Sequence, residues 1–237
     1  MKKYLNKTVL CISDLHCPYQ HPDTIAFLTA IKKKYQPDRV VCLGDEVDAH
    51  AISYHESDPD LASAGHELDQ AIKALQPIYN LFPKVDIIDS NHGSLAFRKA
   101  KTAGLPKKYL REYRDILDAP DGWKWHDSLM ITLSDGQQCF FHHGLKANPV
   151  QVSREYSVNV VQGHFHSTAT IAYASTPYKL LWGMNVGCSI DTHSLAFAYN
   201  KTTLARPIIS HGIIVDGQPR LLPMILTKAS RWCGKVP

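Results

Sequence analysis

Five short segments of this sequence gather aspartate, asparagine and histidine directly after apolar runs. They are Asp14-Leu15-His16, Gly44-Asp45-Glu46-Val47-Asp48, Ser90-Asn91-His92-Gly93, His142-His143-Gly144 and Gly163-His164-Phe165-His166. In extended D-x-H and H-x-H segments alternate side chains point the same way, so both members of a pair can face one ion. Carboxylate, amide and imidazole donors together suit manganese, iron or zinc better than calcium. The set therefore indicates chemistry that depends on metal ions.

Predicted strands and helices alternate along the part of the chain that carries the first three segments. Apolar, β-branched runs predict strands over Thr8–Ser13, Arg39–Leu43 and Val85–Asp89. Apolar residues at helical spacing predict helices over Pro22–Tyr35 and His66–Phe82, the second kinked or split at its internal proline. This alternation predicts an α/β fold with parallel neighbouring strands. Ligands bind at the carboxyl ends of such strands, which is where the polar segments lie.

The second half of the chain has the pattern of a strand-rich region. Strands are predicted over Leu129–Ser134, Gln137–His142, Asn159–Gly163, Ala169–Ser175, Leu180–Val186, Ile208–Val215 and Arg220–Leu226. Asp135-Gly136 and Asp216-Gly217 are typical hairpin turns between neighbouring strands. Between the two halves, the polar stretch Ser94–Asp118 is predicted to be a helical insertion over one edge of a sheet.

Length and composition limit the class of protein. The 237 residues, 44% of them hydrophobic, predict a single packed domain over residues 1–237. No run approaches the roughly 20 apolar residues of a membrane span, and Thr8–Ser13 is too short for a signal peptide. The six cysteines form no C-x-x-C pair, so we expect them to be reduced. These features predict a cytoplasmic protein without a membrane partner, and they identify no protein partner.

The order of the five segments resembles the complete motif series of the calcineurin-like metallophosphoesterases. The resemblance covers residues 14–166 and implies a four-layer α/β sandwich, in which helices flank two mixed β-sheets. It also implies two divalent metal ions, with manganese expected first and iron or zinc as alternatives. By this resemblance, Asp14, His16 and His166 bind one ion, Asn91, His143 and His164 bind the other, and Asp45 bridges them.

The same resemblance gives His92 a separate role. It implies that His92 faces the leaving group as general acid and that Asp48 orients it. A carboxylate beside an imidazole favours the protonated form that a general acid needs. His50 and His55 follow the second segment closely and are the histidines outside the motifs that could border the substrate.

Two positions depart from the family pattern. The third segment begins with Ser90, where the family usually has glycine. Ala49-His50 follows Asp48, where eukaryotic Ser/Thr protein phosphatases have Arg-Gly. The second departure argues against a protein phosphatase and favours nucleotide, nucleic-acid or small phosphoester substrates.

The net charge of +4 is unevenly distributed. Between Arg98 and Asp115 lie seven basic residues and two acidic ones, so the rest of the chain is slightly acidic. If Lys107–Leu117 is a helix, Lys107, Lys108, Arg111 and Arg114 project outward from it. They form either an ordinary solvated face or a surface that attracts an extended phosphate substrate. Arg98, close behind His92, is the residue we expect to contact phosphate directly.

The sequence thus predicts hydrolysis of a phosphomonoester or phosphodiester without a protein nucleophile. Nucleotides or nucleic acids are the favoured substrates, and a phosphorylated small molecule remains open. One alternative is a DNA or RNA nuclease or end-processing enzyme, which the basic insertion favours. A second is a non-catalytic metal-binding scaffold, against which the complete ligand set argues.

Overall fold

Two mixed β-sheets form the centre of the molecule. The structure, a computed structural model, describes residues 6–54, 60–194 and 205–237. The first sheet has the strand order β11 (Gln218–Pro223), β10 (Ser210–Val215), β1 (Thr8–Ile12), β2 (Arg39–Cys42), β3 (Val85–Ile88), β4 (Trp123–His126). The second has the order β5 (Leu129–Thr132), β6 (Gln138–His142), β7 (Asn159–Gln162), β9 (Leu180–Val186), β8 (Ala169–Ser175). The predicted pair of mixed sheets is confirmed.

Because neighbouring strands run in parallel, the polar segments that follow them lie together at one edge of each sheet. β1, β2, β3 and β4 are parallel neighbours in the first sheet, and β6, β7 and β9 are parallel neighbours in the second. The turns at Asp135-Gly136 and Asp216-Gly217 join antiparallel pairs, as the sequence predicts. The carboxyl ends of β1, β2 and β3, and those of β6 and β7, therefore each meet at one edge of a sheet.

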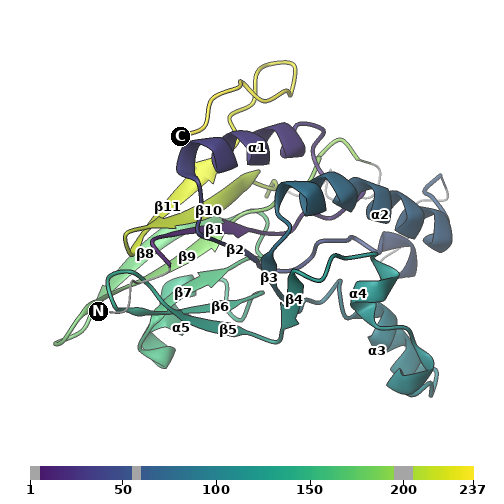
Figure 1. Cartoon of the computed structure of the whole chain (residues 1–237), viewed down its shortest axis with the longest axis horizontal. Coiled ribbons are helices and arrows are strands. Elements are labelled where there is room, and N and C mark those ends of the chain that lie inside the picture. Colours follow the sequence, from purple (N-terminus) through teal and green to yellow (C-terminus); the bar gives the residue numbers. More distant parts are fainter. Residues whose placement is uncertain (1–5, 55–59, 195–204) are drawn as a thin grey trace.

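Helices cover the outer faces of both sheets (Figure 1). They are α1 (Thr24–Tyr35), η1 (His50–Ile52), α2 (Ala64–Leu81), α3 (Leu95–Thr102), η2 (Lys107–Tyr109), α4 (Tyr113–Ile116) and α5 (Pro149–Tyr156). α1 and α2 lie over the first sheet, and α5 packs on β7 and β9 of the second. Within the described ranges, no helix is both long and apolar enough to cross a membrane.

Alternation along β1 shows how the layers are held together. Val9 and Cys11 belong to the core between the sheets, whereas Leu10 and Ile12 belong to the core under α1 and α2. The core between the sheets includes Phe141, Trp182 and Met184, and the core under the helices includes Phe27, Leu75 and Trp123. Because successive side chains of a strand face opposite sides, one buried strand can pack against both layers.

The structure differs from the prediction in two helices. α2 continues through Pro77 as one helix, so of the predicted kink or split the split does not occur. Lys107–Leu117 is not one helix, because Leu110 and Glu112 have extended backbone and separate η2 from α4. Short helices depend on tertiary packing for their stability. Tyr109 is 72% exposed and contributes no inner face, so the interpretation of four outward bases on one helix is wrong.

Candidate metal centre

The first two polar segments are fixed to each other by backbone hydrogen bonds beyond the ends of β1 and β2. Asp14 N donates to Gly44 O at 3.0 Å, and His16 N donates to Asp45 O at 2.9 Å. Gly44 has φ +96°, and an added Cβ there would lie 2.5 Å from Ser90 Cβ. Glycine is therefore required at this close approach of the second and third segments.

The backbone is strained at the predicted ligands. Asp14, His16 and Asp45 have φ near +50°, and His164 has φ +69°. Residues other than glycine rarely adopt this left-handed conformation, and it is held only where the surroundings impose it. Four such residues among the candidate ligands are consistent with a functional site at this edge.

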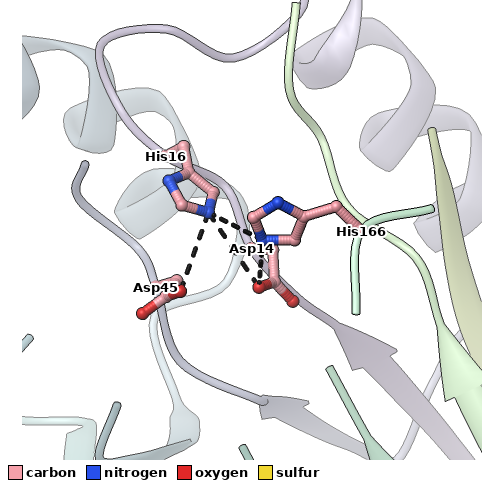
Figure 2. Close-up of side chains that lie close together, drawn as sticks. All are labelled: Asp14, His16, Asp45 and His166. Carbon is pink, nitrogen blue, oxygen red and sulfur yellow. Dashed lines mark hydrogen bonds and ion pairs between the residues drawn. The ribbon is translucent and has the colours of Figure 1, made fainter. Parts of the chain in front are cut away.

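The first cluster of donor atoms comes from three polar segments (Figure 2). His166 Nε2 lies 3.0 Å from Asp14 Oδ1 and 3.1 Å from His16 Nε2, and Asp45 Oδ2 is 3.7 Å from His16 Nε2. One donor atom from each of these residues lies within 4.8 Å of all the others. All four side chains point toward one another, as a shared ion would require.

A second cluster shares Asp45 with the first. Donor atoms of Asp45, His143 and His164 lie within 4.8 Å of one another. Asn91 Oδ1 lies 2.7 Å from His143 Nε2, and Asp45 Oδ2 lies 3.2 Å from the same nitrogen. Asp45 thus stands between two groups of donors.

The donor chemistry of both clusters fits a cation. His143 Nδ1 lies 2.7 Å from Leu43 O, which can only accept a hydrogen bond, so Nδ1 carries the hydrogen. The Nε2 atom of His143 then faces the oxygens of Asn91 and Asp45. Asp45 Oδ2 is itself buried, and when His143 carries no hydrogen on Nε2 this oxygen has no hydrogen-bond partner among the described residues. Acceptors that converge in this way need a positive charge between them.

The pKa shifts of the buried groups also indicate a site that favours positive charge. Burial raises the pKa of Asp14 and of Asp45, but interactions with His166 and His143 outweigh it and lower both pKa values. Burial lowers the pKa of His143, but Asp45 raises it to about 9. The metal-free site therefore holds protons that a divalent cation would replace, and metal binding would release them.

Asp48 contacts both His16 and His92, through different atoms. Its carboxylate Oδ1 lies 2.5 Å from His16 Nδ1 but 4.0 Å from His92 Nδ1. Its backbone carbonyl accepts a hydrogen bond from His92 Nδ1. Asp48 therefore orients His92 through the main chain, whereas its carboxylate orients the candidate ligand His16.

The predicted substrate contacts are divided between two places. Arg98 Nη2 donates to Asn91 O at 2.7 Å, so this guanidinium group lies beside a candidate ligand. Lys107 Nζ lies 5.4 Å from the centre of the Phe97 ring. Arg114 lines the same surface pocket as Lys107 and Phe97, and it pairs with Asp121 at 2.7 Å. Lys108 and Arg111 are exposed, and Arg111 Nη2 donates to Asp115 O at 2.8 Å.

Two serines that sequence reasoning missed support the ligands. Ser13 Oγ donates to Asp14 Oδ2. Ser90 Oγ accepts from Asp45 N at 3.0 Å and from Gly93 N at 3.1 Å. The departure from glycine at Ser90 was the available signal, since a hydroxyl in a polar loop can hold neighbouring backbone.

Of the two histidines near the second segment, His50 is buried and its Nδ1 lies 3.8 Å from Asp48 Oδ2. His50 N also donates to Glu67 Oε1 at 2.7 Å. These contacts give His50 a structural position behind Asp48. His55 lies outside the described residues.

Two stacked mixed sheets whose loops gather carboxylate, amide and imidazole donors, some buried and some open to solvent, define an α/β protein with a candidate metal centre. The chain belongs to the calcineurin-like phosphoesterase family, whose family model matches residues 7–170. The resemblance drawn from the five motifs is thereby confirmed. No curated protein sequence matches the chain.

Solved structures resemble the chain in fold. Vacuolar Protein Sorting 29 from Cryptosporidium parvum has a TM-score of 0.50 and 16% identity, over 98% of this chain and 95% of that one. Chaetomium thermophilum Vps29 has a TM-score of 0.48 and 11% identity, over 97% and 93% of the two chains. Pseudomonas putida nuclease MPE has a TM-score of 0.39 and 13% identity, over 93% of each chain. The first of these similarities supports the fold alone.

Proposed function

We propose that this protein is a metal-dependent phosphoesterase that hydrolyses a phosphomonoester or phosphodiester. The observation that carries the proposal is the shared carboxylate of Asp45, which joins two groups of metal donors. His92 lies in a third group with His16 and Asp48, directly beside the first. A dinuclear centre with an adjacent proton donor is one arrangement that catalyses phosphoester hydrolysis.

The two ions would be held by side chains from both sheets. Asp14, His16 and His166 would bind one ion, and Asp45 would contribute to both. Asn91, His143 and His164 would bind the other. When bound, the two ions supply Lewis acidity at the phosphoryl oxygens and a nucleophile at neutral pH. The mixed oxygen and nitrogen donors suit manganese, with iron or zinc as alternatives.

His92 would donate a proton to the leaving oxygen. Its Nδ1 atom is occupied by the hydrogen bond to the Asp48 carbonyl, which leaves Nε2 as the atom that exchanges a proton with substrate. The side chain is 21% exposed, so Nε2 can meet substrate while the ring is held from behind. Asp48 acts here as a positioning residue.

The favoured substrate is a nucleotide or nucleic acid. Arg98 would contact a phosphate group near the ions, and its hydrogen bond to Asn91 O supports this role. Lys99 Nζ lies 4.5 Å from the centre of the Tyr54 ring and donates to Ser53 O at 3.2 Å. Tyr54 as a whole is 66% exposed. Cations attract phosphates, and exposed aromatic rings can stack on bases.

A nuclease or nucleic-acid end-processing enzyme is the second candidate. The seven basic residues between Arg98 and Asp115 favour it, because an extended phosphate backbone needs several cations outside the catalytic centre. A non-catalytic scaffold would keep the metal donors without turnover.

The test is hydrolysis of 4-nitrophenyl phosphate and bis(4-nitrophenyl) phosphate with Mn²⁺ and with a chelator. Cyclic nucleotides and single-stranded DNA follow as substrates. We expect manganese-dependent turnover that is lost in Asp45→Asn and kept in Asp86→Asn. Asp86 is a half-buried residue of β3 that pairs with Arg39 outside the site. Bound manganese without turnover of any of these compounds would favour the scaffold and overturn the proposal.

A further inference from the structure

An apolar pocket opens beside His92, between η1, α2, α3 and α4. Its volume is about 290 Å³, and its walls are mostly small or aliphatic side chains. They include Val47, Leu68, Ala71, Ala96 and Ile116. Val47 and Ala71 are buried and form the inner wall, whereas Ala96 is exposed at the mouth.

Few polar groups in the described lining are available to a ligand. Glu67 lines the pocket, but its two carboxylate oxygens accept hydrogen bonds from His50 N and Ala51 N, each at 2.7 Å. Besides His92 Nε2, the polar group without a partner in the described lining is the hydroxyl of Tyr113, which is itself buried. A charged group would lose more hydration here than these two atoms can replace. The pocket therefore selects an uncharged, mainly apolar group.

One wall is aromatic and rigid. The ring of Tyr113 lines the pocket and packs edge-on against Trp125 and Phe97, at centroid distances of 5.9 Å and 6.4 Å. Aromatic pairs favour such edge-to-face contacts, which hold the tyrosine in place. A fixed ring beside aliphatic walls suits a flat ligand.

The size of the pocket sets the size of its occupant. A cavity of about 150 Å³ with apolar walls holds one benzene molecule. The pocket beside His92 has about twice that volume, which corresponds to two fused rings.

The pocket adjoins the candidate metal centre through His92. His92 lines the pocket and also lies with His16 and Asp48 at the candidate metal centre. A general acid must reach the oxygen of the leaving group, so the group attached to that oxygen extends along the wall that His92 forms.

We infer that this pocket binds the leaving group of the substrate, and that this group carries an uncharged flat system of about two fused rings. The inference rests on the proposed phosphoesterase function. Two sources share the required chemistry: a carbocyclic aromatic alcohol and a purine nucleoside. The pocket would make the enzyme selective through its leaving group, while the ions and Arg98 bind the phosphate.

The first arm of the test measures ring binding without catalysis. 1-Naphthol and adenosine are titrated separately against the protein in chelator, with Ala96→Leu as the variant that fills the mouth of the pocket. Ala103→Leu is the matched control, because Ala103 is exposed at the end of the same helix and outside the pocket lining. We expect at least one ring to bind saturably to the wild type and the control. Binding to Ala96→Leu should be about tenfold or more weaker, since the added carbons displace ring surface.

The second arm measures selectivity in turnover with Mn²⁺. Phenyl and 1-naphthyl esters are compared as phosphomonoesters and as methyl phosphodiesters, because their leaving phenols have similar acidity. Adenosine 5′-phosphate and ribose 5-phosphate form the nucleotide pair. We expect kcat/KM to favour the larger ring of at least one pair by about tenfold in the wild type. The preference should disappear in Ala96→Leu and remain in Ala103→Leu.

The outcomes separate this inference from the function on which it rests. Failure of both rings to bind the wild type, or equal binding to Ala96→Leu, overturns the pocket assignment. Turnover with an unchanged ring preference in Ala96→Leu also overturns it and leaves the phosphoesterase function standing. Ring binding without metal-dependent turnover of any ester defeats the phosphoesterase function, and the leaving-group role with it.

Discussion

The Asp48 carboxylate lies 2.5 Å from His16 Nδ1, and the Asp48 main-chain carbonyl holds the neighbouring ring of His92. One residue therefore supports a candidate metal ligand with its side chain and a candidate proton donor with its backbone. Substitution of the side chain should affect the first role much more than the second. The two roles can thus be separated by experiment.

Asp48→Asn should weaken metal binding. The carboxylate fixes the His16 tautomer and makes its Nε2 a stronger donor, and loss of such support typically costs about 10- to 100-fold in metal affinity. Manganese affinity measured by calorimetry checks this. Asp86→Asn is the control, because Asp86 pairs with His126 at 2.8 Å in another part of the first sheet. Unchanged affinity together with reduced turnover would assign the carboxylate to His92 instead.

His92→Ala should reduce turnover far more than metal content. Loss of a general acid typically costs about 10²- to 10⁴-fold, and the cost grows as the leaving group becomes less acidic. The variant should therefore lose more activity on phenyl phosphate than on 4-nitrophenyl phosphate, with metal content measured on the same samples. A variant that loses its metals but keeps its rate per bound metal would show that His92 has no role as an acid.

Lys107→Gln with Lys108→Gln should raise KM for single-stranded DNA and flatten its dependence on salt. Each lost phosphate contact lowers the slope of log affinity against log salt by about 0.7 for a single strand. Arg111→Gln with Arg114→Gln is the matched pair, and we expect a smaller effect because Arg114 already pairs with Asp121. Equal salt slopes for wild type and the lysine pair would identify an ordinary solvated surface.

The sequence was sufficient for those parts of the fold whose signals are local. β8 and β9 have the predicted bounds, and the two Asp-Gly turns join the predicted strands. α5 was missed although Asn148 accepts a hydrogen bond from Val150 N and Pro149 follows it, because the helix spans only two turns. β4 was missed because Trp123 and Trp125 alternate over too few residues to show a period.

The parts of the site that depend on contacts between residues far apart in the sequence could not be predicted as well. The five motifs predict the metal donors, and the structure brings those side chains together in two clusters. It does so through left-handed loop residues such as Asp14 and His16, and not through the extended D-x-H pairs that the sequence suggests. The atom through which Asp48 reaches His92 depends on the loop path after β2, and Ala49 in that loop has φ +53°. The pocket also escaped prediction, because Val47, Ala71 and Ile116 are far apart in the chain and show no common pattern.

Gly163→Ala should damage the metal centre. An added Cβ would lie 1.9 Å from Ser13 Oγ and 2.4 Å from Asp14 Oδ2, so it would push the Asp14 carboxylate out of place. We expect lost metal binding and a free energy of unfolding lower by about 1–3 kcal/mol. Gly65→Ala is the control, because nothing lies within 4 Å of an added Cβ there. Metal content and urea denaturation measure both effects, and normal metal binding by Gly163→Ala would contradict the close packing.

His211 should make the protein sensitive to acid. Burial lowers the pKa of this histidine to about 4, from an ordinary value near 6.5. The unfolded chain therefore binds a proton between these values that the folded chain does not. The contribution to stability is complete above about pH 6.5 and is lost as pH falls toward 4, by about 2 kcal/mol at pH 5.

His211→Leu should remove this loss, because leucine does not titrate and the buried Nδ1 has no partner among the described residues. Urea denaturation in chelator at pH 7.5 and at pH 5 measures the difference. His66→Leu serves as the control, since His66 is exposed on α2. Chelator keeps metal ions out of the comparison. The charge of Asp14, which opposes the effect of burial on the pKa of His211, is present in all three proteins. A His211→Leu protein that loses as much stability as the wild type would show that acid sensitivity arises elsewhere.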